Sequence, residues 1–554
     1  MTPFLRHPGH GLAGIQSQGR QTQPVPGMED DAECTVKRLV FALAALLIAL
    51  TAIAPVFAAT PTHSDDAKAK AASGVYYEIF VRSWYDTNGD GIGDLNGVTA
   101  KLDYLQSLGV SGIWLMPINP SPSYHGYDIT DYRAINPQYG SMTDFERLVR
   151  EAHKRGIKIV MDLVINHSSN RHPWFLAARD PHGKYHDWYT WATPTTDLKA
   201  VSATGGPAWH ALPNGQSYLG IFVDEMPDLN YDNPAVRTEM IGIGKFWLEK
   251  GVDGFRLDAA QHIYDDLETD WDSASVLRKN LEWWRQFDRG IKTANPHAWL
   301  VGEVARQHAS ELVPWAGALD ATFNFPLAAR LIESAAQERD LDLGATLART
   351  DKAYRAAAHG RFDDAPFLSN HDQERVMSQL DGNPDHMRIA AAMLLTLPGH
   401  PFVYYGEELG MRGQKPDPHL REPMRWYRAG KGSGEPTWEG WTAGDGPGVS
   451  VEAQHGDAGS LLNWYRMLID WRRDIPALRD GVAHAWRDAN MQVAAWELDD
   501  PHGDVLVLHN LSGKPQTITV PAQRFHSLLK YSRPDTSFDG DRMTLPPYGS
   551  AILQ

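Results

Sequence analysis

The chain has 554 residues, of which 42% are hydrophobic and 22% charged, a composition typical of folded globular proteins. Its formal net charge of −17 excludes nucleic acid and anionic membrane as the main partner, because both require a basic surface. The charge is compatible with a neutral ligand such as a sugar.

The N-terminal region has the order of features that a secretory signal peptide requires. A short basic start at residues 36–38 precedes an apolar run, residues 39–54, and a small-residue exit that ends near Ala58. A membrane anchor is the alternative, but the run is short for a spanning helix of about 20 residues. We therefore expect residues 36–58 to be a signal peptide and the mature protein to be secreted or periplasmic, with no membrane attachment after cleavage.

The segments on either side of this signal do not resemble domains. Residues 1–35 form an upstream extension that an over-called start codon would explain, and residues 59–73 form a polar spacer. Cys34 is the only cysteine and precedes the apolar run, so the expected mature chain has none. Disulfides, thiolate metal sites and cysteine nucleophiles are thereby excluded.

Strand and helix patterns alternate from residue 74 to about residue 480. Eight short apolar or β-branched runs, with helical patterns between most of them, predict a parallel sheet, and eight strands close a (β/α)8 TIM barrel. The expected helices include residues 143–155 and 235–250, the second ended by Gly251 as a C-terminal cap. The expected strands are Val75–Val81, Gly112–Ile118, Ile157–Ile165, Val252–Leu257, Trp299–Val304, Ala321–Phe325, Ala365–Leu368 and Pro401–Tyr405.

Two parts of the chain depart from this alternation. More than 60 residues, rich in His, Pro, Gly and Trp, separate the third strand from the helix that begins at Asn233, and so long a connection is usually functional or a small domain. We expect an inserted domain B at residues 168–230, between barrel segments 74–167 and 231–480. Beyond residue 480, hairpin patterns predict a C-terminal antiparallel β-sandwich domain over residues 481–554.

Polar side chains gather where the expected barrel strands end, and this is where such barrels carry their catalytic groups. Any one of these carboxylates would more simply be a surface charge or a helix cap. Carboxylates grouped at several strand ends raise at least one pKa, which keeps a carboxyl group protonated as an acid. The strand-end side chains are Asp162, Asn166, His167, Arg256, Asp258, His262, Glu303, Asn370, His371 and Asp372.

These segments resemble the conserved regions of the α-amylase family, glycoside hydrolase family 13. The similarity extends to residues 226–230 (Met-Pro-Asp-Leu-Asn) and 126–128 (Gly-Tyr-Asp), and it covers about residues 75–481. The resemblance implies a retaining enzyme that cleaves α-1,4-glucosidic bonds in starch and maltooligosaccharides by double displacement. It implies Asp258 as the nucleophile, Glu303 as the general acid/base and Asp372 as the stabiliser of the reacting sugar.

The resemblance also implies the residues that bind this sugar. Arg256 would hold Asp258 ionised, since an opposite charge favours the carboxylate. His167 and His371 would donate hydrogen bonds to the sugar, and Tyr127 would stack on its face. We expect His125 either to contact the same sugar or to make a structural hydrogen bond, and Asp162 to orient the network.

Residues 86–94 follow the first strand and carry oxygen-bearing side chains at alternate positions, as calcium loops do. The EF-hand pattern fails, because its twelfth position is Gly97 and the loop follows a strand. A similar loop binds calcium in members of the family that the chain resembles, so we expect one structural Ca²⁺; a plain Gly/Asp turn is the alternative. The expected ligands are Asp86, Asn88, Asp90, the carbonyl of Ile92, and Asp94.

Tyr124 bears on the mode of cleavage. Exo-acting α-glucosidases of the family usually carry an Asp there, and its salt bridge with a distant Arg closes the site behind the terminal sugar. A tyrosine cannot form that salt bridge, which favours an endo-acting enzyme. The calcium loop and residues 172–175 and 421–426 resemble the oligosaccharide-acting branch, and Gln261 replaces a Lys that many α-amylases use. The resemblance thus implies an intermediate subgroup between α-amylases and oligosaccharide-acting α-glucosidases.

Two other functions remain open at this point. One is an exo-acting α-glucosidase or transglycosylase on short α-glucans. The other is a non-catalytic glucan-binding protein, which would be expected to lose at least one catalytic carboxylate, whereas all three are present. Most of the 19 tryptophans are expected in the core, with Trp188 and Trp209 the first to test for sugar stacking. We expect a monomer.

Overall fold

The computed structural model describes residues 74–265, 267, 273–360, 363–486 and 490–554. The expected upstream extension, signal peptide and polar spacer lie outside the described residues, as does Cys34. Among the residues that are described, no helix has the length and hydropathy needed to cross a membrane.

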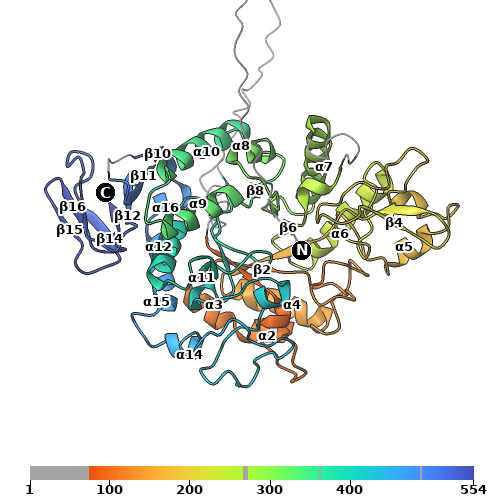
Figure 1. Cartoon of the computed structure of the whole chain (residues 1–554), viewed down its shortest axis with the longest axis horizontal. Helices are drawn as coiled ribbons and strands as arrows, with labels where there is room; N and C mark the ends of the chain where they lie inside the picture. Colours follow the sequence, from red (N-terminus) through yellow and green to blue (C-terminus); the bar gives the residue numbers. More distant parts are fainter. Residues whose placement is uncertain (1–73, 266, 268–272, 361–362, 487–489) are drawn as a thin grey trace, which may run out of the picture. The chain divides into compact units, whose positions relative to one another are not determined.

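A parallel sheet forms the centre of the fold (Figure 1). Seven regular strands follow the order β8-β7-β6-β3-β2-β1-β9, and every neighbouring pair is parallel. The expected strand at residues 365–368 does not form a regular strand. Single parallel bridges instead join Phe323 to Ala365 and Phe367 to Phe402, and they connect the two ends of the sheet. The (β/α)8 prediction is confirmed, with the seventh position reduced to these bridges. The strands are β1 Tyr76–Ile79, β2 Gly112–Leu115, β3 Lys158–Leu163, β6 Gly254–Leu257, β7 Trp299–Gly302, β8 Ala321–Thr322 and β9 Phe402–Tyr404.

The helices between the strands begin and end where their capping residues predict. Helix α4 (Met142–Lys154) begins with a capping box between Ser141 and Asp144. Helix α6 (Pro234–Glu249) begins with the Asn233 side chain accepting the Ala235 N–H, and Gly251 follows its end with φ of +95°. The other helices that accompany the barrel are α2 Leu95–Ala100, α3 Leu102–Leu108, α7 Ala274–Lys292, α9 Phe325–Ala336, α10 Leu343–Ala357, α12 Pro384–Leu395 and α15 Leu461–Asp474.

The barrel interior changes from aromatic to charged along the strands. Side chains two apart share a face of a strand, so Tyr76 and Glu78 of β1 point to the same side. The Tyr76 ring stacks 5.1 Å from both Trp299 and Phe402, forming an apolar layer. Closer to the carboxyl ends of the strands, Glu78 is buried near Arg256 of β6 and near His371 and Asp372. The sheet therefore places its buried charges beneath the loops that follow the strands.

The expected domain B carries its own small elements. Helix α5 (Pro173–Ala178) is followed by the antiparallel strands β4 (Trp209–Ala211) and β5 (Ser217–Leu219). An antiparallel bridge between His167 and Asp228 links the two ends of this insertion. The insertion therefore leaves from and returns to the end of β3.

Strands after residue 480 form two antiparallel sheets, drawn in blue in Figure 1. Their orders are β10-β11-β12-β17-β14 and β13-β16-β15, and one apolar cluster includes side chains from both. This confirms the antiparallel β-domain predicted from the hairpin pattern. The strands are β10 Val482–Ala485, β11 Val493–Asp499, β12 Val505–Asn510, β13 Gln516–Thr519, β14 Leu528–Tyr531, β15 Ser537–Asp539, β16 Arg542–Leu545 and β17 Ser550–Leu553.

Candidate active site

One guanidinium group joins the carboxylates at the ends of three neighbouring strands. Arg256 Nη1 lies 2.6 Å from Asp258 Oδ1 and 2.9 Å from Asp162 Oδ1, and its Nη2 lies 2.9 Å from Glu303 Oε2. The Arg256 side chain is 1% exposed, so these charges interact with little screening by water. The structure thus brings Asp258 and Glu303 together on either side of one fixed cation.

Burial and this cation act on the carboxylates in opposite directions. Burial raises the pKa of Asp258 and of Glu303, and the positive charge of Arg256 opposes the rise in both. Burial also raises the pKa of Asp162 to about 7 against the same cation. A carboxyl group with a raised pKa retains its proton to higher pH, which is what a general acid requires.

A left-handed residue shapes the turn between the two carboxylates. Ala259 follows Asp258 with φ of +46°, a conformation that is uncommon for residues other than glycine. In this conformation its N–H donates to Glu303 Oε2 at 3.0 Å. Strained backbone of this kind tends to occur at functional sites, and here it fixes Glu303 against the end of β6.

The third expected catalytic carboxylate is held from two sides. Arg421 Nη2 lies 2.8 Å from Asp372 Oδ1, and His371 Nε2 lies 3.1 Å from Asp372 Oδ2. Burial alone would raise the pKa of Asp372, but His371 and Arg421 hold it well below its usual value. Asp372 therefore stays ionised to lower pH than a free aspartate, in contrast to Asp258 and Glu303, whose pKa values are raised. Carboxylates whose pKa values are pushed apart mark distinct roles in acid–base catalysis.

All three carboxylates line one cavity of about 330 Å³. Tyr127, His125 and His167 line it as well, as the sequence predicts for substrate-binding residues. The Tyr127 hydroxyl donates to Asp162 Oδ2 at 3.0 Å and lies 2.7 Å from His371 Nε2. Its ring stacks on that of His371 at 5.5 Å. Three of the expected sugar-binding residues thus lie beside the carboxylates, whereas the other two, Arg256 and His371, are buried behind the cavity and do not line it.

The two other histidines of the cavity differ from His371. Burial lowers the pKa of His125 and of His167 to about 4, so both are neutral near pH 7. His125 Nδ1 accepts the Tyr127 N–H at 3.1 Å, which leaves the proton on Nε2. The structural hydrogen bond expected for His125 is therefore present, and its other nitrogen remains a donor.

Tyr124 contacts the arginine that would pair with an acid at its position. The Tyr124 hydroxyl accepts a hydrogen bond from Arg421 Nη1 at 3.3 Å. Arg421 also lies 3.4 Å from Asp417, four residues before it, in addition to Asp372. Arg421 therefore meets a neutral hydroxyl at position 124, where a carboxylate would form a salt bridge.

The expected calcium loop contains only oxygen donors, which suits a hard cation. Asp86 accepts backbone N–H groups of Asn88 and Gly91 at 3.0 and 2.8 Å, and Asp94 accepts those of Thr87 and Gly97 at 2.8 and 2.7 Å. In this conformation the carboxylate oxygens of Asp86, Asp90 and Asp94 do not all come within 4.8 Å of one another. The loop is folded by its own hydrogen bonds. Its carboxylate and amide oxygens are ligands of the type that Ca²⁺ prefers.

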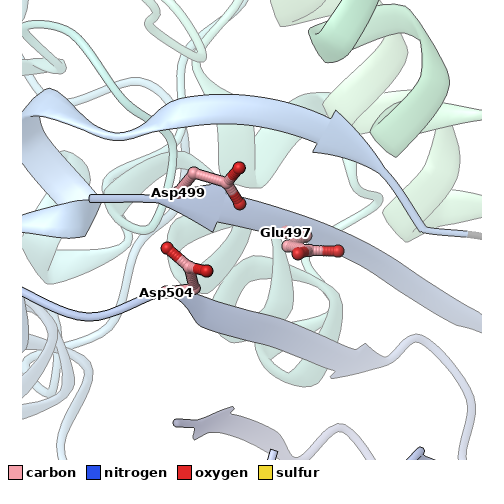
Figure 2. Close-up of side chains that lie close together, drawn as sticks. All are labelled: Glu497, Asp499 and Asp504. Carbon is pink, nitrogen blue, oxygen red and sulfur yellow. The ribbon is translucent and has the colours of Figure 1, made fainter. Parts of the chain in front are cut away.

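Within the described ranges, one group of three acidic side chains does bring its oxygens that close together (Figure 2). Glu497 and Asp499 lie on β11, and Asp504 immediately precedes β12. Glu497 forms an ion pair with Arg524, and Asp499 lies 3.0 Å from His484. Two of these carboxylates therefore already have cationic or histidine partners from the protein.

The two tryptophans singled out in the inserted segment lie outside the catalytic cavity. Trp188 is buried and packs 4.8 Å from Trp174 and 4.9 Å from Tyr185, lining a hollow of about 490 Å³. Trp209 lines a separate hollow of about 720 Å³. Neither ring lines the cavity that holds Asp258.

Sequence reasoning missed two residues of the site. Glu78 lies within the apolar run of β1 and contacts His371, and Arg421 was noticed only as part of a motif. The period-two pattern of β1 could have revealed Glu78, because it places this charge on the face of Tyr76. Arg421 carries no local signal, since it follows the short helix α13 (Asp417–Leu420) and not a barrel strand.

A barrel with paired carboxylates at its strand ends, both with pKa values raised by burial, defines an enzyme of the glycoside hydrolase class. The sequence matches the family described as "Alpha amylase, catalytic domain" over residues 78–481, and the "Alpha-amylase SusG C-terminal domain" over residues 493–552. The chain belongs to the α-amylase family.

Individual relatives of the chain carry names for more than one activity. Alpha-amylase 3 of Dictyoglomus thermophilum is 40% identical over 483 residues, covering 87% of this chain and 93% of the relative. A 4-alpha-glucanotransferase of Thermotoga maritima is 34% identical over 448 residues, covering 79% and 96%. The crystal structure of an alpha-amylase from H. orenii is 44% identical with a TM-score of 0.80, covering 87% and 99%. These relatives are consistent with an intermediate group of the family.

Proposed function

We propose that the protein is a secreted retaining glycoside hydrolase that cleaves α-1,4-glucosidic bonds of starch and maltooligosaccharides within the chain. The observation that carries the chemistry is the guanidinium of Arg256, which holds Asp258 and Glu303 beside one cavity. Retaining glycosidases need two carboxyl groups about 5–5.5 Å apart that flank the scissile bond.

In the proposed mechanism, Glu303 protonates the leaving oxygen while Asp258 attacks the anomeric carbon. Glu303, now a carboxylate, then takes a proton from the water that hydrolyses the glycosyl-enzyme. Asp372 accepts hydrogen bonds from sugar hydroxyls as positive charge develops on the ring. The neutral His125 donates to the same sugar through Nε2, and Tyr127 supplies an aromatic face. His167 lines the cavity with both ring nitrogens occupied, by Asn166 Oδ1 and the Tyr127 carbonyl at 3.0 Å each, so it shapes the sugar site and does not donate to the sugar.

Substitution of each carboxylate tests this chemistry. Asp258→Asn and Glu303→Gln should each remove nearly all hydrolysis of starch while leaving the protein folded, as judged by circular dichroism. Near-wild-type activity in either variant would refute the assignment.

Cleavage within the chain is supported by Tyr124, which offers Arg421 a neutral hydroxyl in place of a carboxylate. One hydrogen bond from a charged donor contributes about 1.5–3 kcal/mol, and at 3.3 Å this one is long, so the hydroxyls of a longer glucan can replace it. An α-glucosidase or a transferase is the alternative, favoured by the glucanotransferase among the relatives. A maltoheptaose blocked at its non-reducing end separates the modes. An endo-acting enzyme cuts it, and an exo-acting enzyme leaves it intact.

We further propose one structural Ca²⁺ in the loop at residues 86–94. The side chains of Asp86, Asn88, Asp90 and Asp94 and the carbonyl of Ile92 would hold it and stiffen the connection after β1. Chelation should lower the temperature of thermal unfolding, and added Ca²⁺ should restore it. An unchanged unfolding temperature would contradict the site. Export is tested separately, by sequencing the N-terminus of the exported protein, which should begin near Ala59.

A further inference from the structure

Glu78 is a carboxylate inside the barrel that lies next to the catalytic cavity but does not line it. It is 1% exposed and lies on the same face of β1 as Tyr76, two residues closer to the carboxyl end of the strand than the aromatic layer. Burial of a carboxylate costs several kcal/mol unless a partner compensates for the lost water. Its partner should therefore be close and charged.

That partner is His371, whose two ring nitrogens both face oxygens. Nδ1 lies 2.5 Å from Glu78 Oε1, while Nε2 lies 3.1 Å from Asp372 Oδ2 and 2.7 Å from the Tyr127 hydroxyl. A neutral imidazole has one donor and one acceptor, so it would place a lone pair against a carboxylate. The imidazolium, with two N–H donors, satisfies both sides.

We propose that Glu78 is a positioning residue, which holds His371 as an imidazolium and thereby keeps Asp372 ionised and oriented toward the sugar. Glu78 itself touches neither substrate nor reacting atoms. The inference rests on the proposed role of Asp372 and deepens it, because the stabilising anion then depends on a charge on the opposite side of His371.

The electrostatics of His371 agree with this geometry. Burial raises the pKa of Glu78, and the positive charge of His371 opposes that rise. Burial disfavours the charge on His371, but Asp372 and Glu78 outweigh it and raise its pKa to about 9. His371 also packs edge-on against Trp114 at 5.6 Å, and its carbonyl accepts a hydrogen bond from Arg421 Nε at 3.0 Å. The charged and titratable groups around it are Glu78, Tyr127, Asp162, Arg256, Asp258, Asp372 and Arg421.

Glu78→Gln is the informative substitution, because it retains size and a carbonyl oxygen but removes the charge. His371 then loses one of its two carboxylate neighbours, and its pKa falls toward the ordinary value of about 6.5. We expect kcat on maltoheptaose to fall about 10- to 100-fold at pH 8, with KM little changed. A loss of this size is typical when a residue that orients a functional histidine is replaced. At pH 5.5, where His371 is protonated in both proteins, the loss should shrink to about threefold or less.

Glu408→Gln is the matched control. Glu408 is equally buried and accepts a hydrogen bond from the Tyr77 hydroxyl at 2.7 Å, but it does not contact His371. The ratio of its kcat to that of the wild type should not vary with pH. Nitrogen NMR of labelled histidine provides a direct reading. His371 should carry two protons at pH 8 in the wild type and one in Glu78→Gln.

A pH-independent activity ratio for Glu78→Gln, or an unchanged titration of His371, would overturn the inference. The proposed function fails by a different result, namely activity retained in Asp258→Asn or Glu303→Gln. Inactive Asp258→Asn and Glu303→Gln together with a flat ratio for Glu78→Gln would therefore reject only the role of Glu78.

Discussion

Replacement of Arg256 with methionine removes the one cation that Asp162, Asp258 and Glu303 share. Both terminal nitrogens of its guanidinium, Nη1 and Nη2, are used, with contacts of 2.6–2.9 Å to the three carboxylates. Removal of one partner from a buried ion pair costs about 3–5 kcal/mol, because a charge remains without compensation. We expect Arg256→Met to lower the free energy of unfolding by about that amount at pH 8 and to abolish hydrolysis.

The dependence of this loss on pH identifies its cause. Without Arg256, the folded-state pKa values of the three carboxyl groups rise further above their unfolded values. Stability from a raised pKa is fully present below the unfolded value, about 4, and is lost as pH rises through the folded value. The difference between variant and wild type should therefore be small near pH 4 and reach its full size by pH 8.

Urea unfolding followed by tryptophan fluorescence at both pH values measures the difference. Arg256→Lys is the matched control. It retains the charge but cannot direct two nitrogens at two carboxylates, so it should lose about 1.5–3 kcal/mol, the value of one charged hydrogen bond. An equal loss for Arg256→Met at pH 4 and pH 8 would refute the electrostatic reasoning and indicate a packing defect.

Two further predictions concern stability away from the site. Burial raises the pKa of Glu407 to about 8. The contribution of this group to the free energy of unfolding is therefore lost as pH rises from about 4.5 through 8. Glu407→Gln should raise the temperature of thermal unfolding at pH 9 and leave it unchanged at pH 4; equal shifts would contradict this. Gly251→Ala should cost more than about 1 kcal/mol in urea, since φ is +95° and the new Cβ would lie 2.8 Å from Val149 Cγ1. Gly156→Ala, with φ of +72° and open space, should cost less, and the reverse order would refute the packing argument.

The regular helices and strands of this fold could be predicted from the sequence, because capping residues and apolar runs agree with the tertiary structure. The capping residues Ser141 and Asn233 start helices α4 and α6 where expected. The expected strand at residues 365–368 does not form a regular strand. Its neighbours are joined to it only through Ala365 and Phe367, and single bridges do not make a regular ladder. Apolar content therefore predicted the position of this strand but not its pairing.

The carboxylates at strand ends could be predicted because the barrel brings all strand ends to one rim. Their electrostatic partners could not. Glu78 is separated from His371 by 293 positions, and Arg421 from Tyr124 by 297. These contacts depend on how the barrel closes and on how a long loop returns over it, and no local pattern encodes either. The sequence thus indicates which groups react but not which groups set their charge.

Trapping the covalent intermediate tests the central claim most directly. A 5-fluoro maltosyl fluoride of α configuration slows both steps, so the glycosyl-enzyme of a retaining hydrolase accumulates. Asp258 displaces the anomeric fluoride and the C5 fluorine stays on the sugar, so digestion and mass spectrometry should find one added 5-fluoromaltosyl group on the peptide that carries Asp258, and none in Asp258→Asn. Labelling of another carboxylate, or inhibition without any covalent adduct, would contradict the account.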